Sequence, residues 1–194
     1  TIQSTTAPGN SGEIIIDKDL TIEAPSVTAT LDANESAFST GEDKHRIFRV
    51  KGGKTLTLKN LTLKNGAVGN GVVGSLGTTG GGIRIENGTV LLSDVIISSC
   101  KAITAGRYNA QGKYEGFHGN GAGIYVVSGT VTMENATLSA NDASAHGGAV
   151  YLNGGTLTMK GSSVITPSTI SNANKTGKND VHLKGGAKII VDGA

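Results

Sequence analysis

The sequence predicts an all-β fold, a parallel β-helix with three strands per coil and about five to six coils. The main observation is a repeated unit, in which a short alternating run, a glycine turn and a second alternating run follow one another. The clearest copy is Gly147–Met159, and the same order recurs in Gly121–Met133, Gly80–Leu92, Arg46–Leu58 and, in diluted form, Val181–Val191. Alternation with a period of two gives each strand one buried face, and so small a unit can bury that face only by stacking on its neighbours.

Three strands of each coil are expected to direct aliphatic side chains inward. Residues 1–12 are predicted to be an extended lead-in. The first coil then has Ile14, Ile16, Leu20, Ile22 and the segment 28–31. The inward positions of the next four coils are Phe48, Val50, Leu56, Leu58, Leu61 and Leu63; Ile83, Ile85, Val90, Leu92, Val95 and Ile97; Ile124, Val126, Val131, Met133, Ala136 and Leu138; Val150, Leu152, Leu157, Met159 and Val164. Residues 13–194 are therefore expected to form one β-helix domain. Because the chain ends where a third strand should begin, we expect a fragment of a longer protein.

A sharp turn is predicted at the same point of every coil, between the second and third strands. This point is occupied by Asn60, Asp94, Asn135, Gly161 and Gly193. These residue types tolerate the left-handed backbone conformation better than others do. Backbone chemistry and hydrophobic periodicity therefore predict the same repeat boundaries.

The repeats differ in length, and the extra residues enter at one place, after the third strand. The insertions are residues 66–80, 101–119, 142–146 and 171–178. Insertions at one corner of a stack place the loops on one side of the molecule, where a rigid scaffold displays them for binding.

Composition excludes several functional classes. Gly accounts for 30 of 194 residues but Pro for only 3, which does not fit a collagen or a disordered linker. The net charge is +2 with the charges scattered, so no nucleic-acid partner is expected. No run is long and apolar enough for direct membrane insertion. The one cysteine, Cys100, has no internal partner for a disulfide and is interpreted as a small buried filler at a corner.

Two short motifs carry a family resemblance. Gly147–Val150 matches a glycine-glycine-small-aliphatic motif, and Leu138–Asn141 matches an aliphatic-x-x-Asn motif. Their pairing resembles the repeats of polymorphic outer membrane proteins, and residues 45–66 look like one coil of bacterial surface proteins with a right-handed parallel β-helix. The resemblance implies a right-handed parallel β-helix in an extracellular, outer membrane-associated or secreted setting. It also implies adhesion to host cells or matrix, often as the passenger of an exported protein.

Outward-facing residues of the first strands are expected to form two rows. The first row is Arg49, Arg84, Tyr125, Tyr151 and His182, and the second is Lys51, Glu86, Val127, Asn153 and Lys184. Aromatic faces stack on sugar rings and arginine binds carboxylate or sulfate groups, so Arg84, Tyr125 and Tyr151 are candidate binding residues. The alternative is ordinary cross-strand packing of exposed side chains.

The insertion at residues 101–119 holds three of the seven phenylalanine and tyrosine residues of the chain. Its candidate binding residues are Arg107, Tyr108, Tyr114, Phe117 and His118. Aromatic residues and arginine are typical anchors of recognition surfaces. Alternatively, Tyr114 and Phe117 fold back to cover the third-strand corner.

Neither catalysis nor a metal or cofactor is expected. Lyases and glycosidases need paired carboxylates or an acidic calcium site, and Glu86 is the only carboxylate in the two outward rows. His118 could approach His146 and Glu115, but the spacing is arbitrary and a solvated histidine is the simpler interpretation.

The second strands show a further pattern on their outer face. Its residues are Thr55, Thr57, Thr89, Leu91, Thr130, Thr132, Thr156 and Thr158. Regular threonine rows resemble those of ice-binding proteins, although threonine is also simply a favourable exposed strand residue.

The sequence thus predicts an adhesion module whose partner is a host-cell or extracellular-matrix glycan or protein, bound by loops on one side. The alternatives are a structural spacer of a larger surface protein and, behind it, an ice-binding protein or a polysaccharide lyase-like enzyme. End-to-end self-association through an open C-terminal coil is a further expectation.

Overall fold

The computed structural model describes residues 12–25, 29–33, 45–69, 78–103, 105–108, 114–117, 119–166 and 180–193; for 105–108 and 114–117 the description covers the backbone. The strands are β1 (Ile14–Ile16), β2 (Leu20–Glu23), β3 (Ala29–Asp32), β4 (Phe48–Lys51), β5 (Thr55–Lys64), β6 (Ala67–Val68), β7 (Ile83–Ser98), β8 (Lys101–Ala102), β9 (Ala105–Tyr108), β10 (Tyr114–Phe117), β11 (Ile124–Glu134), β12 (Thr137–Ser139), β13 (Asp142–Ala143), β14 (Val150–Leu152), β15 (Thr156–Lys160), β16 (Val164–Ile165), β17 (Val181–Leu183) and β18 (Lys188–Asp192). No helix occurs in these residues, so the predicted all-β class is confirmed for the described part of the chain. His118 and most of the predicted lead-in lie outside it.

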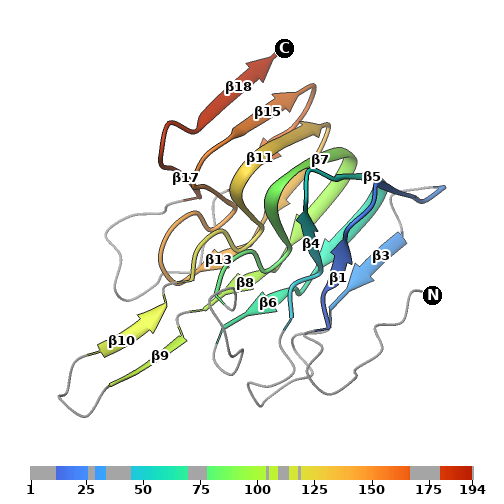
Figure 1. The fold of residues 1–194 in the computed structure, drawn as a ribbon. Helices are drawn as coiled ribbons and strands as arrows, with labels where there is room; N and C mark the ends of the chain where they lie inside the picture. Colours follow the sequence, from blue (N-terminus) through green and yellow to red (C-terminus); the bar gives the residue numbers. More distant parts are fainter. Residues whose placement is uncertain are drawn as a thin grey trace.

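Successive copies of the repeat lie side by side as parallel strands. A 13-stranded sheet runs in the order β1-β4-β7-β11-β14-β17 along one path, and β5, β7, β11, β15 and β18 follow one another along a second. Figure 1 shows this second path from β5 to β18 at the C-terminal end. All pairings inside this sheet are parallel. Each copy of the repeat therefore contributes one layer to a stack.

The core consists of columns of apolar side chains that run through the layers. One column is Leu20, Leu56, Val90, Val131, Leu157 and Ile189, which pair in register from β2 to β18. Another is Phe48, Ile83, Ile124, Val150 and Val181. The side chains of the middle layers are fully buried, as the alternating pattern predicts.

Two details of the strands differ from the prediction. The runs predicted as three separate strands of one layer form one continuous element in β7, because the ladder to the neighbouring layers continues through the corners. Val164 was expected to face inward, but it pairs with Thr137 on the outer side and is 48% exposed. Ile165 is the residue that pairs with the buried Leu138, so the inward register begins one residue later than predicted.

The predicted left-handed corners are confirmed. Asn60, Asp94 and Asn135 have φ angles of 56°, 53° and 51°, and the glycines at the equivalent points also have positive φ. A second left-handed corner, which the sequence does not predict, follows the third strand at Asn65, Ser99 and Ala140. Serine and alanine are not typical of this conformation, so only the stacked backbone reveals this corner.

The double-glycine motif has a steric explanation. Its first glycines, Gly80, Gly121 and Gly147, have φ angles of 70°, 61° and 64°. The motif's third position approaches the next layer closely: a Cβ added at Gly82 would lie 2.5 Å from the Gly123 carbonyl oxygen. Small residues at this position therefore let the layers stack at the spacing of a parallel ladder.

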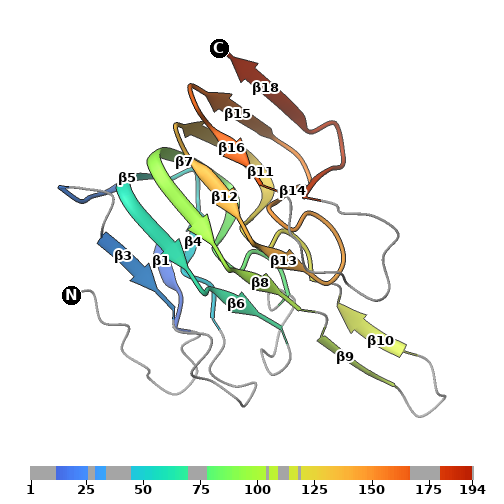
Figure 2. The same cartoon turned by 180° about the vertical axis from the view of Figure 1, so that it is seen from behind.

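The insertion side holds a small additional sheet. β6, β8 and β13 form three parallel strands, with Val68, Ala102, Ala122 and Ala143 as a separate apolar cluster. Figure 2 shows this sheet beside the main one. Two-residue strands carry no periodic signal, so the sequence predicts only insertions here.

The side chain of Asn141, the last residue of the aliphatic-x-x-Asn motif, is buried at this corner. It donates a hydrogen bond to the Ile97 carbonyl (2.9 Å) and accepts one from the Cys100 N–H (3.0 Å), so it joins two layers. Cys100 is buried as predicted, and burial raises the pKa of its thiol to about 12.

Candidate functional site

The first predicted row forms a continuous ladder of side chains. Arg49, Arg84, Tyr125, Tyr151 and His182 are partners in register on β4, β7, β11, β14 and β17. The Arg84 guanidinium lies over the Tyr125 ring at 5.1 Å from its centroid, and the Tyr125 and Tyr151 rings stack at 5.1 Å. His182 stacks on Tyr151 at 4.7 Å and on His146 at 4.6 Å. We call these six residues the arginine–aromatic ladder.

The ladder side chains are less exposed to solvent than is expected for outward-facing strand positions. Arg84 is 8% exposed and Tyr151 is 7% exposed, while Tyr125 and His182 are half-buried. Burial raises the pKa of both tyrosines, although the nearby Arg84 charge opposes this for Tyr125, so both phenols stay neutral at neutral pH. Contacts within the ladder thus occupy the faces of Tyr125 and Tyr151 that a sugar ring would need.

An ion-pair network extends the ladder towards the N-terminal layer. Glu86 accepts from Arg49 (Nη2 to Oε2, 2.9 Å) and from Arg84 (Nε to Oε1, 2.6 Å). Arg49 also reaches Glu13 (3.5 Å), and Arg46 is paired with Glu13 and donates to the carbonyls of Thr79 and Gly80. The network therefore ties three layers together through three arginines and two glutamates.

The sequence predicts only half of this network. Glu86 is the only carboxylate predicted in the outward rows, but Arg49 contacts both Glu86 and Glu13. Arg46 and Thr79 were not identified either, because the contacts join residues that are 33 to 37 positions apart. The one signal in the sequence is position, since Glu13 and Arg46 lie one and two residues before the strands that begin at Ile14 and Phe48. The second predicted row does not continue beyond Glu86, because a bulge between Val126 and Ser128 places Ser128 opposite Glu86.

The charges of the network favour ion pairing over proton transfer. Burial would raise the pKa of Glu86, but hydrogen bonds and charges from Arg84 and Arg49 outweigh it and lower this pKa below its ordinary value. Burial lowers the pKa of Arg46, opposed by Glu13. The Glu86 carboxylate therefore links neighbouring strands through ion pairs. Its lowered pKa does not suit a general acid, which must carry a proton near neutral pH. The described residues contain no group of three or more histidine, cysteine or acidic side chains placed to hold a metal ion.

Glu86 makes the stability of the protein sensitive to acid. Because its pKa is lower in the folded state, its stabilising contribution is present above the ordinary pKa of 4.5 and is lost as the pH falls through the folded value. We expect Glu86→Gln to be less stable than wild type at neutral pH and to lose less stability on acidification. Urea unfolding measured from neutral pH to below pH 4.5 tests both effects. If the free energies of unfolding of the two proteins fell in parallel as the pH is lowered, the lowered pKa of Glu86 would be contradicted.

The second group of candidate residues lies on a projecting hairpin. β9 and β10 form a separate two-stranded antiparallel sheet with Tyr108 opposite Tyr114 and Arg107 opposite Glu115. Figures 1 and 2 both show this hairpin extending beyond β8, away from the stacked layers. Arg107, Tyr108, Tyr114 and Phe117 are thus brought onto one short element, which is separate from the arginine–aromatic ladder in the sheet order.

The predicted threonine rows are in register. Thr55, Thr89, Thr130 and Thr156 pair in succession, and the neighbouring row is Thr57, Leu91, Thr132 and Thr158. Leu91 is 37% exposed and interrupts the second row, while Lys188 and Ile190 follow the two rows on β18. The first threonine row therefore extends only from β5 to β15, and the second is interrupted at β7.

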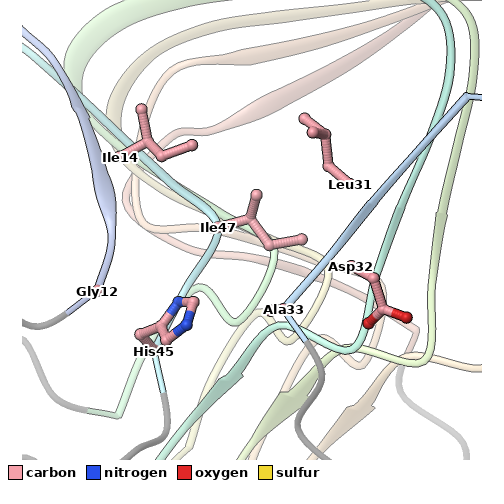
Figure 3. A pocket seen from close by; sticks show the side chains of 7 residues that line it. All are labelled: Gly12, Ile14, Leu31, Asp32, Ala33, His45 and Ile47. Atoms are coloured by element: carbon pink, nitrogen blue, oxygen red, sulfur yellow. The ribbon is translucent and has the colours of Figure 1, made fainter. Parts of the chain in front are cut away.

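A recess lies beside the first layer. It has a volume of about 190 Å³ and is lined by Gly12, Ile14, Leu31, Asp32, Ala33, His45 and Ile47. Figure 3 shows Ile14, Leu31 and Ile47 as its aliphatic side chains, with His45 and Asp32 as its polar ones. His45 is hydrogen-bonded through Nδ1 to the Arg46 carbonyl at 3.0 Å. The recess therefore lies between the first layer and the start of the second, and none of its lining residues belongs to the hairpin.

Comparison with protein-family models, with curated proteins and with solved structures gives no match for this chain. In the part of the chain that the structure describes, no helix is long and apolar enough to cross a membrane.

Proposed function

We propose that this chain is a right-handed parallel β-helix module of a bacterial cell-surface or secreted protein, similar to the polymorphic outer membrane proteins. The in-register parallel pairing of successive repeats supports this architecture. The usual right-handedness of parallel crossovers supports its hand. The stack acts as a rigid support, and the insertions on one side carry recognition.

The module adheres to a host-cell or extracellular-matrix glycan or protein through the β9–β10 hairpin. The observation that carries this proposal is the placement of four of the candidate residues on one element that projects from the stack. Tyrosine, phenylalanine and arginine supply large contact areas at recognition surfaces. The ladder residues Arg84 and Tyr151 are buried, so in this proposal they support the scaffold rather than contact the partner.

A structural spacer is the second candidate function. The arginine–aromatic ladder and its ion-pair network favour it, because their side chains contact one another and tie layers together. Such contacts stiffen a stack without any ligand.

A binding screen on a combined glycan and matrix-protein array separates the two candidates. We expect wild type to bind, and a variant with residues 106–116 replaced by a short Gly-Ser linker to bind at least about tenfold more weakly, the change expected when a binding anchor is lost. The matched control shortens the predicted insertion at residues 171–178, which lacks aromatic residues, and should bind as wild type does. Absence of binding by all three proteins, with intact β-structure by circular dichroism, would favour the spacer.

A further inference from the structure

The β9–β10 hairpin has two open strand edges. It forms a sheet of its own, and no other strand in the described part of the chain pairs with β9 or β10. Each outer edge therefore presents backbone N–H and C=O groups that the hairpin itself does not use. In contrast, β7 and β11 in the stack have partners on both sides.

The hairpin is also the element that would gain most from another strand. It is held by four paired positions, from Ala105 with Phe117 to Tyr108 with Tyr114. A two-stranded hairpin alone is marginally stable in water, whereas three strands are markedly more stable. A third strand would satisfy one open edge and order the hairpin at the same time.

Of the features that usually protect an edge, the two strands have short length and the charges of Arg107 and Glu115 but lack others. Neither β9 nor β10 contains proline or lysine, and their pairing shows no bulge. The charged residues Arg107 and Glu115 are opposite each other, and so are Gly106 and Gly116. The two glycines leave one position of the ribbon without side chains, where another backbone can approach closely.

We propose that an extended peptide segment of a partner protein adds to this hairpin as a third strand. The inference rests on the proposed adhesive function and narrows its partner to a protein. Main-chain hydrogen bonds supply most of the affinity, and residues flanking the glycines supply selectivity. Since Tyr108, Tyr114 and Phe117 are aromatic, the segment is expected to carry β-branched or aromatic residues, which form favourable cross-strand pairs.

The test uses the complete 194-residue chain and overlapping peptides tiled across matrix proteins. A peptide that binds is resynthesised with a single N-methyl group at each backbone nitrogen in turn. Successive N–H groups of a strand point to opposite sides, so strand addition predicts a period of two. Methylation should weaken binding at least about tenfold at alternate positions, the loss expected when a hydrogen bond is removed, and have little effect between them. Amide hydrogen exchange of residues 105–108 and 114–117 should slow when the peptide binds.

Each outcome decides the proposal. Weaker binding at every second N-methylated position of the peptide, together with slower amide hydrogen exchange of the hairpin, supports strand addition. Strand addition is overturned if N-methylation weakens binding without a period of two. It is also overturned if the peptide still binds the variant with residues 106–116 replaced. Hairpin-dependent binding of glycans alone also overturns strand addition but leaves the adhesive function standing. Absence of binding to both peptides and glycans removes both proposals.

Discussion

Replacing Leu157 with Asp is expected to unfold several layers together and to lower the free energy of unfolding by more than about 4 kcal/mol. Leu157 is fully buried and lies between Val131 and Ile189 in one aliphatic column. The substitution removes a packed side chain and places a carboxylate where no cation is in register. Because each layer packs on its neighbours, the damage should spread beyond β15.

Urea and thermal unfolding followed by circular dichroism measure this effect. The matched control is Thr158→Asp, which introduces the same carboxylate at the next residue, where the Thr158 side chain is only partly buried on the outer face. The control should change stability by less than about 1 kcal/mol, as surface substitutions usually do. An unchanged melting midpoint for Leu157→Asp would refute the stacked core.

Replacing Arg46 with Met is expected to lower the free energy of unfolding by about 3–5 kcal/mol, the usual consequence of removing one partner of a buried ion pair. The side chains of Arg46 and Glu13 are each 5% exposed. Without Arg46, the Glu13 carboxylate keeps the longer contact to Arg49 as its one ion pair within the described residues, and the carbonyls of Thr79 and Gly80 lose a donor.

Two further variants identify the origin of this loss. Lys59→Met removes a similar charge from the Lys59–Glu23 pair, whose side chains are 42% and 53% exposed, and should cost less than about 1 kcal/mol. The double variant Arg46→Met with Glu13→Leu removes both buried charges and should recover much of the stability. Equal losses for Arg46→Met and Lys59→Met would show that burial of the pair is unimportant.

Predictions for the core succeeded where two independent signals agreed. Alternating aliphatic residues predicted the buried columns, and Asn60, Asp94 and Asn135 marked the left-handed corners between them. Both signals are local, because side-chain direction and backbone preference depend on a few neighbouring residues. Val164 was placed wrongly because its short run gave no alternation with which to choose between two registers.

The candidate binding residues were predicted less completely. The alignment of Arg84, Tyr125 and Tyr151 was predicted from the repeat and is confirmed. The burial of Arg84 and Tyr151 is not predicted, since it depends on contacts between side chains of neighbouring layers. The sequence predicts only an insertion where the β9–β10 hairpin lies, because its two four-residue strands alternate too briefly to be recognised.

The sequence by itself determined the repeat, the inward columns and the first set of corners, because each follows from periodicity and local backbone preference. Only the tertiary structure decided that Glu13 and Arg46 meet between layers, that Asn141 joins two corners, and that the hairpin stands apart from the sheets. These features join residues far apart in the chain or depend on what surrounds an element. Contacts of that kind arise only when the layers have stacked.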